Sequence, residues 1–319
     1  MNARWFLVRR VVFSAVVVWL VLSVTFGLFV VAPDSRLGGL TGAAAFGGAD
    51  AEEIAAIEAA YLEAHGFDRP VYVQYADWMT AIPTLQWGES FVTGEPVRGM
   101  VASALWRSAQ YVLPAALLSV IAGIGIGVYG ALNPGSRGDR SGRLAAYVAL
   151  GVPNFFAGII AVILLGDFVM FVEYGQVAEN VWLQHVMPVV LLSTTLAGAM
   201  VSYTRASARE YIDSEFIKLV WAKGASSRHV TAHVLKNAAP PLVALLFAEL
   251  LAVLLLAVFV IEHVFLIDGI GMLVLDSVYE RDVPVLLAVT FVVVFVGVVG
   301  NLLSDVASVV LDPRTASES

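Results

Sequence analysis

The chain has 319 residues, of which 59% are hydrophobic and only 14% are charged, and its mean hydropathy is +0.84. Soluble domains are about half apolar and about a quarter charged, so this composition excludes a typical soluble enzyme and favours a membrane protein. The net charge of −8 argues against a nucleic-acid partner, and the sequence has no cysteine for disulfides or metal ligation.

Six apolar runs are long enough to cross a bilayer, because a spanning helix needs about 20 predominantly apolar residues. They cover 11–32, 109–132, 144–171, 183–204, 241–261 and 284–304. The first run is longer than the core of a signal peptide and lacks a small-residue cleavage site, so we interpret it as a retained helix. The sequence therefore predicts an all-α integral membrane protein with six transmembrane helices in a lipid bilayer.

Basic residues indicate on which side of the membrane each connection lies. Arg137, Arg140 and Arg143 follow the second run, and six further Lys or Arg residues lie between the fourth and fifth runs. Under the positive-inside rule, both connections and the two termini are cytoplasmic. The expected organisation is a cytoplasmic N-terminus (1–10), a first transmembrane helix (11–32), an external loop (33–108), a five-helix core (109–311) and a cytoplasmic tail (312–319).

The external loop contains the pattern of one short surface helix. Asp50 and Glu53 have the spacing of a capping box at its start, and Gly66 is the type of residue that ends a helix. The apolar residues of one helical face lie between them, at Ile54, Ile57 and Tyr61. We therefore expect a helix between Asp50 and Gly66.

The cytoplasmic connection 205–238 is the most informative stretch of the chain. Four apolar residues have the spacing i, i+1, i+4 and i+5, which places them on one side of a short helix: Phe216, Ile217, Val220 and Trp221. Gly224 is expected to end this helix, Ser226 or Ser227 to cap a second short helix, and Pro240–Pro241 to open the fifth run. The resulting tip has no core of its own to enter, which favours docking on a partner protein. The alternative is an interfacial helix that lies on the bilayer surface.

This connection resembles the coupling loop of permease subunits in ATP-binding-cassette importers that use a separate binding protein. It is most similar to the B-type permeases of the dipeptide, oligopeptide and nickel group, whose A-x-A-K-G and H-x-L-x-N-A-x-x-P patterns are matched at Ala222, Lys223, Gly224, His233, Leu235, Asn237 and Pro241. Shorter matches follow in the family's order along nearly the whole chain, at 31–34, 66–70, 74–75, 88–90, 133–137, 152–155, 262–265, 269–271, 281–284, 301–305 and 312–314.

The resemblance implies the type I importer permease fold and a set of partners. These are a second homologous permease subunit, two cytoplasmic ATPases and an external solute-binding protein. It also implies that the ATPase contacts a coupling set made of Phe216, Ile217, Val220, Trp221, Ala222, Lys223, Gly224, Arg228, His233 and Asn237. ATP and Mg would be bound by the ATPases, so this chain is expected to be no enzyme and to bind no cofactor. The expected cargo is a dipeptide or oligopeptide, and the alternatives are nickel, an oligosaccharide or another solute.

Charged residues in or near the apolar runs give further candidates. Glu249 in the fifth run either lines the translocation path or is a structural acid between helices. Four charged residues near the outer ends of the last two runs either form an outer gate, meet the binding protein or are simply solvated: Glu262, Asp268, Arg281 and Asp282. Gly123 and Gly127, four residues apart in the second run, are expected to allow close contact between helices.

Other activities have little support in the sequence. His229 and His233 have a spacing that can bind zinc, but no third ligand is evident, so no metal site is expected. An intramembrane hydrolase would need Ser119 or Ser193 as its nucleophile, and no histidine lies clearly within an apolar run. A passive membrane scaffold is the other distant alternative, and it leaves the tip at Trp221 unexplained.

Overall fold

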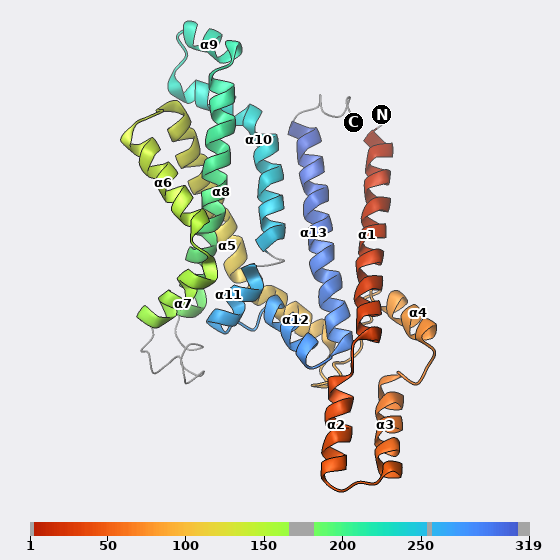
Figure 1. Cartoon of the computed structure of the whole chain (residues 1–319). Helices are drawn as coiled ribbons and strands as arrows, with labels where there is room; N and C mark the ends of the chain where they lie inside the picture. The colour runs from red at the N-terminus through yellow and green to blue at the C-terminus, as the bar shows by residue number, and fades with distance from the viewer. Residues whose placement is uncertain (1–2, 166–181, 254–256, 312–319) are drawn as a thin grey trace. The chain divides into compact units, whose positions relative to one another are not determined.

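The computed structural model describes residues 3–165, 182–253 and 257–311, and its named elements are all helices (Figure 1). They are α1 (Ala3–Val31), α2 (Ser35–Phe46), α3 (Ala51–His65), α4 (Val71–Ala81), α5 (Val97–Leu132), α6 (Arg137–Gly151), α7 (Asn154–Leu165), the π-helix η2 (Trp182–Val186), α8 (Met187–Ile212), α9 (Glu215–Ala222), α10 (Ser227–Ala252), α11 (Val258–Phe265), α12 (Ile270–Tyr279) and α13 (Val283–Leu311). The all-α prediction is confirmed for these residues. The expected cytoplasmic tail 312–319 lies outside them.

Several of these helices can cross a membrane. Within the described residues, four segments are long and apolar enough: Val8–Phe46, Val97–Leu132, Trp182–Ile212 and Val283–Val306. Two helix pairs pass the same test only together, across a bend: Arg137–Gly151 with Phe156–Leu164, and Val258–Phe265 with Ile270–Tyr279. This part of the chain therefore supplies four spans, or up to six if each bent pair counts as one.

The third predicted run, 144–171, is not one straight helix. Helices α6 and α7 meet at an angle of 94°, and Val152 between them has φ −95° and ψ 114°. Proline disfavours the helical conformation of the residue before it, so Pro153 ends α6 at this point. The part of the run beyond residue 165 lies outside the described residues.

The expected helix start at Pro240–Pro241 is wrong. Helix α10 begins at Ser227 and continues through both prolines to Ala252. A proline inside a helix removes one backbone hydrogen bond and crowds the carbonyl four residues earlier. Helices of membrane proteins tolerate this where neighbouring groups satisfy the freed carbonyl. Because α10 packs along α8 (Figure 1), the second short helix of the sequence prediction is the beginning of a long one.

The chain divides into two compact units, and the first comprises the described parts of Met1–Leu7, Trp106–Asp268 and Gly297–Ser319. Its central helix is α8, which packs against α6, α7 and α10. Gly123 and Gly127 of α5 also face α8. A Cβ atom added to Gly123 would lie 2.3 Å from the Cβ of Met200, and one added to Gly127 would lie 2.7 Å from the Cβ of Thr204. The predicted close helix contact is therefore confirmed.

The second unit comprises Val8–Leu105 and Gly269–Val296. Helices α2 and α3 form an antiparallel pair in it (Figure 1). Asp50 and Glu53 form the predicted capping box of α3, and Gly66 ends the helix with φ 67°. Tyr61 is buried on the predicted apolar face. The expected helix is therefore present as α3, and α2 and α4, which were not predicted, accompany it. Asp34 caps α2 by accepting hydrogen bonds from the backbone N–H groups of its first turn.

Candidate functional site

Helix α9 and the corner after it form the predicted coupling segment. The Ser214 hydroxyl accepts a hydrogen bond from the backbone N–H of Ile217 and thereby caps α9. Gly224 has φ 80°, a left-handed conformation that glycine adopts without steric cost. Ser226 caps α10 by accepting from the backbone N–H of His229. The predicted helix, glycine corner and serine cap are all present.

The apolar stripe of α9 divides into an anchored face and an open face. Ile217 is only 1% exposed and belongs to a cluster whose other buried members come from α5, α8 and α10: Val128, Ala131, Ala208 and Val230. Val220 packs against the same cluster. The expectation of a tip without a core of its own is therefore wrong for Ile217, because the ends of three helices provide that core.

Two large apolar side chains of α9 are exposed, and they lie on different sides of the helix. Leu219, which was not selected from the sequence, lies on the open face opposite Ile217 and is 55% exposed. Trp221, four residues after Ile217, lies beside the anchored face and is 41% exposed. Ala222, Lys223 and Gly224 are also exposed. The amphipathic spacing identifies this helix, but not which of its apolar residues turn inward. The side chains of Phe216, Arg228 and Asn237 lie outside the described part of the structure.

The two histidines of α10 contact each other. The Nε2 atoms of His229 and His233 lie 3.1 Å apart. Among the described residues, histidine, aspartate and glutamate form no group of three that could hold a metal ion.

A buried ion pair joins the start of α6 to α8. The Asp139 carboxylate at the start of α6 has no exposed surface, and the Nε atom of Arg205 on α8 lies 2.6 Å from its Oδ1. The backbone N–H of Gly135 donates to its Oδ2 at 2.9 Å. The sequence analysis missed Asp139, although one acid among three nearby arginines is a recognisable signal.

Glu262 is buried, so the interpretation of this residue as a solvated charge is wrong. Its side chain is 0% exposed. Its Oε1 accepts hydrogen bonds from the Ser108 hydroxyl at 2.5 Å and the Tyr111 hydroxyl at 2.8 Å. These bonds join α11 to α5 within the first unit.

Arg281 and Asp282 in the second unit are not solvated charges either. Asp282 is 3% exposed, and its carboxylate accepts hydrogen bonds from the Ser90 hydroxyl and the backbone N–H of Phe91. Arg281 pairs with Asp34 at 3.2 Å. Its guanidinium also donates to backbone carbonyls at the end of α1, those of Phe29, Ala32 and Pro33. These two residues hold the turn before α13 against the end of α1 and the segment before α5.

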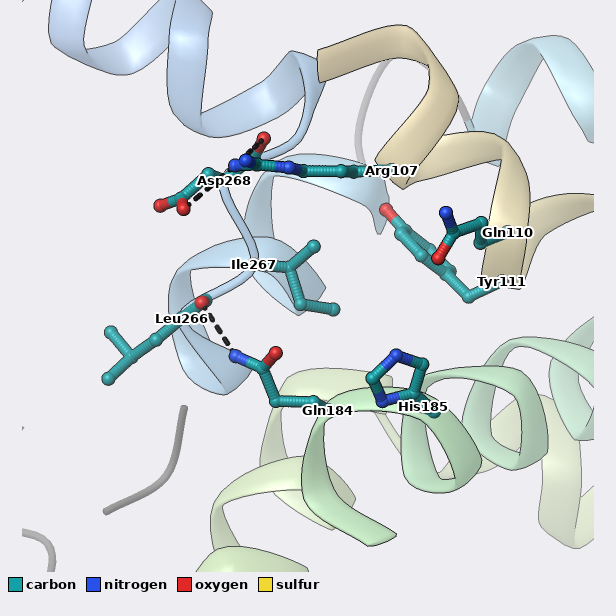
Figure 2. Close-up of a pocket in the computed structure, with 8 residues that line it drawn as sticks. All are labelled: Arg107, Gln110, Tyr111, Gln184, His185, Leu266, Ile267 and Asp268. Atoms are coloured by element: carbon teal, nitrogen blue, oxygen red, sulfur yellow. Dashed lines mark hydrogen bonds and ion pairs between the residues drawn. The ribbon is translucent and has the colours of Figure 1, made fainter. Parts of the chain in front are cut away.

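Asp268 lines a cavity. The cavity has a volume of about 450 Å³, and its lining is Arg107, Gln110, Tyr111, Gln184, His185, Leu266, Ile267 and Asp268 (Figure 2). The carboxylate of Asp268 lies 2.9 Å from a guanidinium nitrogen of Arg107. Glu249 lies on α10, is partly exposed, and does not line this cavity.

Neither serine considered as a nucleophile is arranged for catalysis. Ser119 donates to the carbonyl of Ala116, and Ser193 donates to the carbonyl of Val190. Both hydroxyls are thus bonded back to their own helices.

Comparison with known proteins identifies the family. Residues 123–317 match the model of the binding-protein-dependent transport system inner membrane component, and residues 3–105 match the N-terminal model of the same membrane component. Three relatives illustrate the similarity. The oligopeptide transport system permease protein AppB of Bacillus subtilis is 28% identical over 80% of this chain and 83% of its own length. The dipeptide transport system permease protein DppB of Lactococcus lactis is 30% identical over 79% of this chain and 82% of its own length.

The metal-staphylopine import system permease protein CntB of Staphylococcus aureus is 26% identical over 79% of this chain and 80% of its own length. The two family models together account for most of the chain, and the apolar helices agree with a protein that crosses the membrane several times. The chain therefore belongs to the inner membrane components of binding-protein-dependent transport systems, the permease subunits of ATP-binding-cassette importers, and is a multi-pass protein of the cell membrane.

Proposed function

We propose that this chain is one of two homologous permease subunits of an ATP-driven importer of dipeptides or oligopeptides. An external binding protein delivers the peptide, and two cytoplasmic ATPases bind and hydrolyse ATP. The relatives named for oligopeptide and dipeptide transport support this cargo, because each aligns over about four fifths of both chains. This permease then performs no covalent chemistry and needs no cofactor of its own.

The proposed topology has six spans and cytoplasmic termini. Residues 33–108 form the external region. The core 109–311 carries the connection 205–238, which contains the coupling segment, on the cytoplasmic side. The excess of arginine and lysine at 137–143 and 205–236 supports this orientation. In this topology the bent pair of α6 and α7 is the third span.

The division of α9 into two faces is the observation that carries the proposed coupling function. The exposed side chain of Leu219 on the open face and that of Trp221 beside the anchored face would contact the ATPase. The anchored face with Ile217 touches the ends of α5, α8 and α10, so a displacement of α9 would be passed to three helices at once. Close-packed interiors transmit displacement because they have little free volume to absorb it.

A metal complex is the second candidate cargo. CntB, whose name assigns it to metal-staphylopine import, has an identity and coverage close to those of the peptide permeases. The scaffold is therefore compatible with either cargo, and the relatives named for peptide transport favour the peptide.

Co-purification with the ATPases tests the proposed coupling. The complex is expressed from neighbouring genes with a tag on this chain, as wild type and as Trp221→Glu and Gly224→Pro. The first variant replaces an exposed aromatic side chain of α9 by a charged one, and the second imposes an incompatible φ at the corner. A matched control is Tyr72→Glu on α4, which alters another exposed aromatic residue, 75% exposed.

We expect the ATPases to co-purify with wild type and Tyr72→Glu and to be lost in both α9 variants. Equal recovery of the ATPases in all four proteins would contradict docking through α9. The absence of any ATPase from the wild-type preparation would contradict the importer function itself and favour a passive scaffold.

A further inference from the structure

The cavity of Figure 2 is built from three separate segments of the first unit. Arg107, Gln110 and Tyr111 come from α5, Gln184 and His185 from η2, and the residues 266–268 follow α11. The charge pattern of the sequence independently predicts that the start of α5, the start of the fourth apolar run at η2 and residues 266–268 lie on the external side. The cavity therefore lies where a solute released by an external binding protein would first meet this chain.

The walls of the cavity are fixed by hydrogen bonds. The hydroxyl of Tyr111 is held by the buried Glu262 carboxylate at 2.8 Å. The side-chain amide of Gln184 donates to the carbonyl of Leu266 at 3.0 Å, as Figure 2 shows. Leu266 itself has φ 51°, a left-handed conformation that reverses the chain after α11. This reversal brings Asp268 to the rim of the cavity.

The rim differs from the walls because it is held by an exposed ion pair. The side chains of Arg107 and Asp268 are 49% and 83% exposed, and their closest charged atoms lie 2.9 Å apart. Exposed ion pairs of this kind contribute little stability, so a competing ion can separate them at small cost. A guanidinium also presents paired N–H donors that match the two oxygens of a carboxylate.

We propose that this cavity binds the free α-carboxylate of the transported peptide, which displaces Asp268 and pairs with Arg107. The amide of Gln110 and the ring of His185, which also line the cavity, are placed to contact the polar backbone of the peptide (Figure 2). A volume of about 450 Å³ lies in the usual range for small-molecule sites. The inference rests on the proposed peptide cargo, and it assigns recognition of the carboxyl terminus to a residue of the permease.

The test compares trialanine with trialanine amide as cargo. The complete complex is reconstituted in liposomes with its binding protein, and the uptake rates of the two peptides are measured below saturation. The result is expressed as the ratio of the uptake rate of trialanine to the uptake rate of trialanine amide. Because the binding protein is the same throughout, its own preference cancels when variants are compared. A variant that yields less assembled complex still gives a valid ratio.

We expect Arg107→Gln to lower this ratio about tenfold, because a hydrogen-bonded charge pair with the carboxylate is lost. Asp268→Asn removes the competing carboxylate, so it should raise the ratio. Arg107→Lys keeps the charge and should retain most of the preference. The matched control is Arg69→Gln, which breaks another exposed arginine–aspartate pair, with Asp77 at 2.6 Å, and should leave the ratio unchanged.

The opposite signs separate recognition from a merely structural role. If the ion pair only stabilised the fold, Arg107→Gln and Asp268→Asn would both lower the yield of complex and would leave the ratio unchanged. That result, or an unchanged ratio in Arg107→Gln, would overturn the inference while the wild-type uptake still supported the proposed function. Wild-type liposomes that take up neither peptide would instead contradict the peptide cargo, and this inference with it.

Discussion

The guanidinium of Arg205 holds the carboxylate of Asp139 by two hydrogen bonds, from Nε to Oδ1 at 2.6 Å and from Nη2 to Oδ2 at 3.1 Å. The backbone N–H of Gly135 donates to the same carboxylate. Gly130 of α5 also lies against it, because an added Cβ there would be 2.9 Å from Oδ1. The end of α5, the start of α6 and the last third of α8 are thus joined at one buried group.

Asp139→Asn should therefore lower the thermal stability of the purified protein by several degrees. The change removes the negative charge and leaves the partly buried Arg205 with an incomplete set of partners, which is costly for a buried pair. Thermal unfolding in detergent measures the effect.

The matched control for this variant is Glu215→Gln, which breaks the exposed pair of Glu215 with Lys218 at 2.7 Å. The Lys218 ammonium lowers the pKa of Glu215 by its hydrogen bond and its charge, but an exposed pair of this kind contributes little to stability. Equal shifts of the melting temperature in the two variants would show that the buried pair has no special structural role.

Ile217→Ala tests the anchored face of α9. Removing a fully buried isoleucine leaves a cavity among α5, α8 and α10, and the expected loss is about 2–5 kcal/mol in the free energy of unfolding. Leu219→Ala on the open face of the same helix should change stability by less than about 0.5 kcal/mol. Denaturant titration of both variants measures the difference, and a Leu219→Ala variant as unstable as Ile217→Ala would refute the assignment of the two faces.

Gly123→Ala tests the contact between α5 and α8. The new methyl group would lie 2.3 Å from the Cβ of Met200, so the helices must separate, at an expected cost of about 1–3 kcal/mol. Gly125→Ala, on the same helix with no atom within 4 Å of the added methyl, should be neutral or stabilising by up to about 1 kcal/mol. The order of stability of the two variants is the readout, and the reverse order would disprove this packing.

The stability of the second unit should fall at alkaline pH because of Tyr61. Burial, together with the charge of the Asp34 carboxylate, raises the pKa of Tyr61 above its ordinary value of 10.0. The folded state therefore keeps the proton that the unfolded state loses, so the stabilisation is complete below about pH 10 and is lost as the pH rises through the folded pKa. Unfolding measured between pH 9 and about pH 12 should show a shallower decline for Tyr61→Phe than for wild type, whereas parallel declines would contradict the role of this hydroxyl.

Local features of the fold are readable from the sequence because their partners are close in the chain. Asp50 and Glu53 bond across one helical turn, Gly66 needs only its own backbone freedom, and Ser226 bonds to a backbone group three residues away. Apolar length and the distribution of basic residues likewise predict membrane helices without knowledge of their neighbours. The coupling segment is readable for the same reason, and the family resemblance depends on short motifs that are themselves local in the sequence.

The features that could not be predicted from the sequence depend on partners that are distant in the chain. Glu262 is bonded to a serine 154 positions earlier, and Asp282 to one 192 positions earlier. No local pattern reveals such pairs, so both acids were open to interpretation as solvated charges. The inward position of Ile217 likewise depends on three other helices. The bend at Pro153 was predictable in principle, because proline restricts the residue before it.

ATP-dependent uptake of a labelled peptide tests the central claim most directly. The permease pair, its ATPases and its binding protein are reconstituted in liposomes, and accumulation of trialanine inside is followed with and without ATP. We predict accumulation that requires ATP and the binding protein together and is abolished by Trp221→Glu. No accumulation under any of these conditions, with all subunits present and assembled, would contradict the assignment of this chain to peptide import.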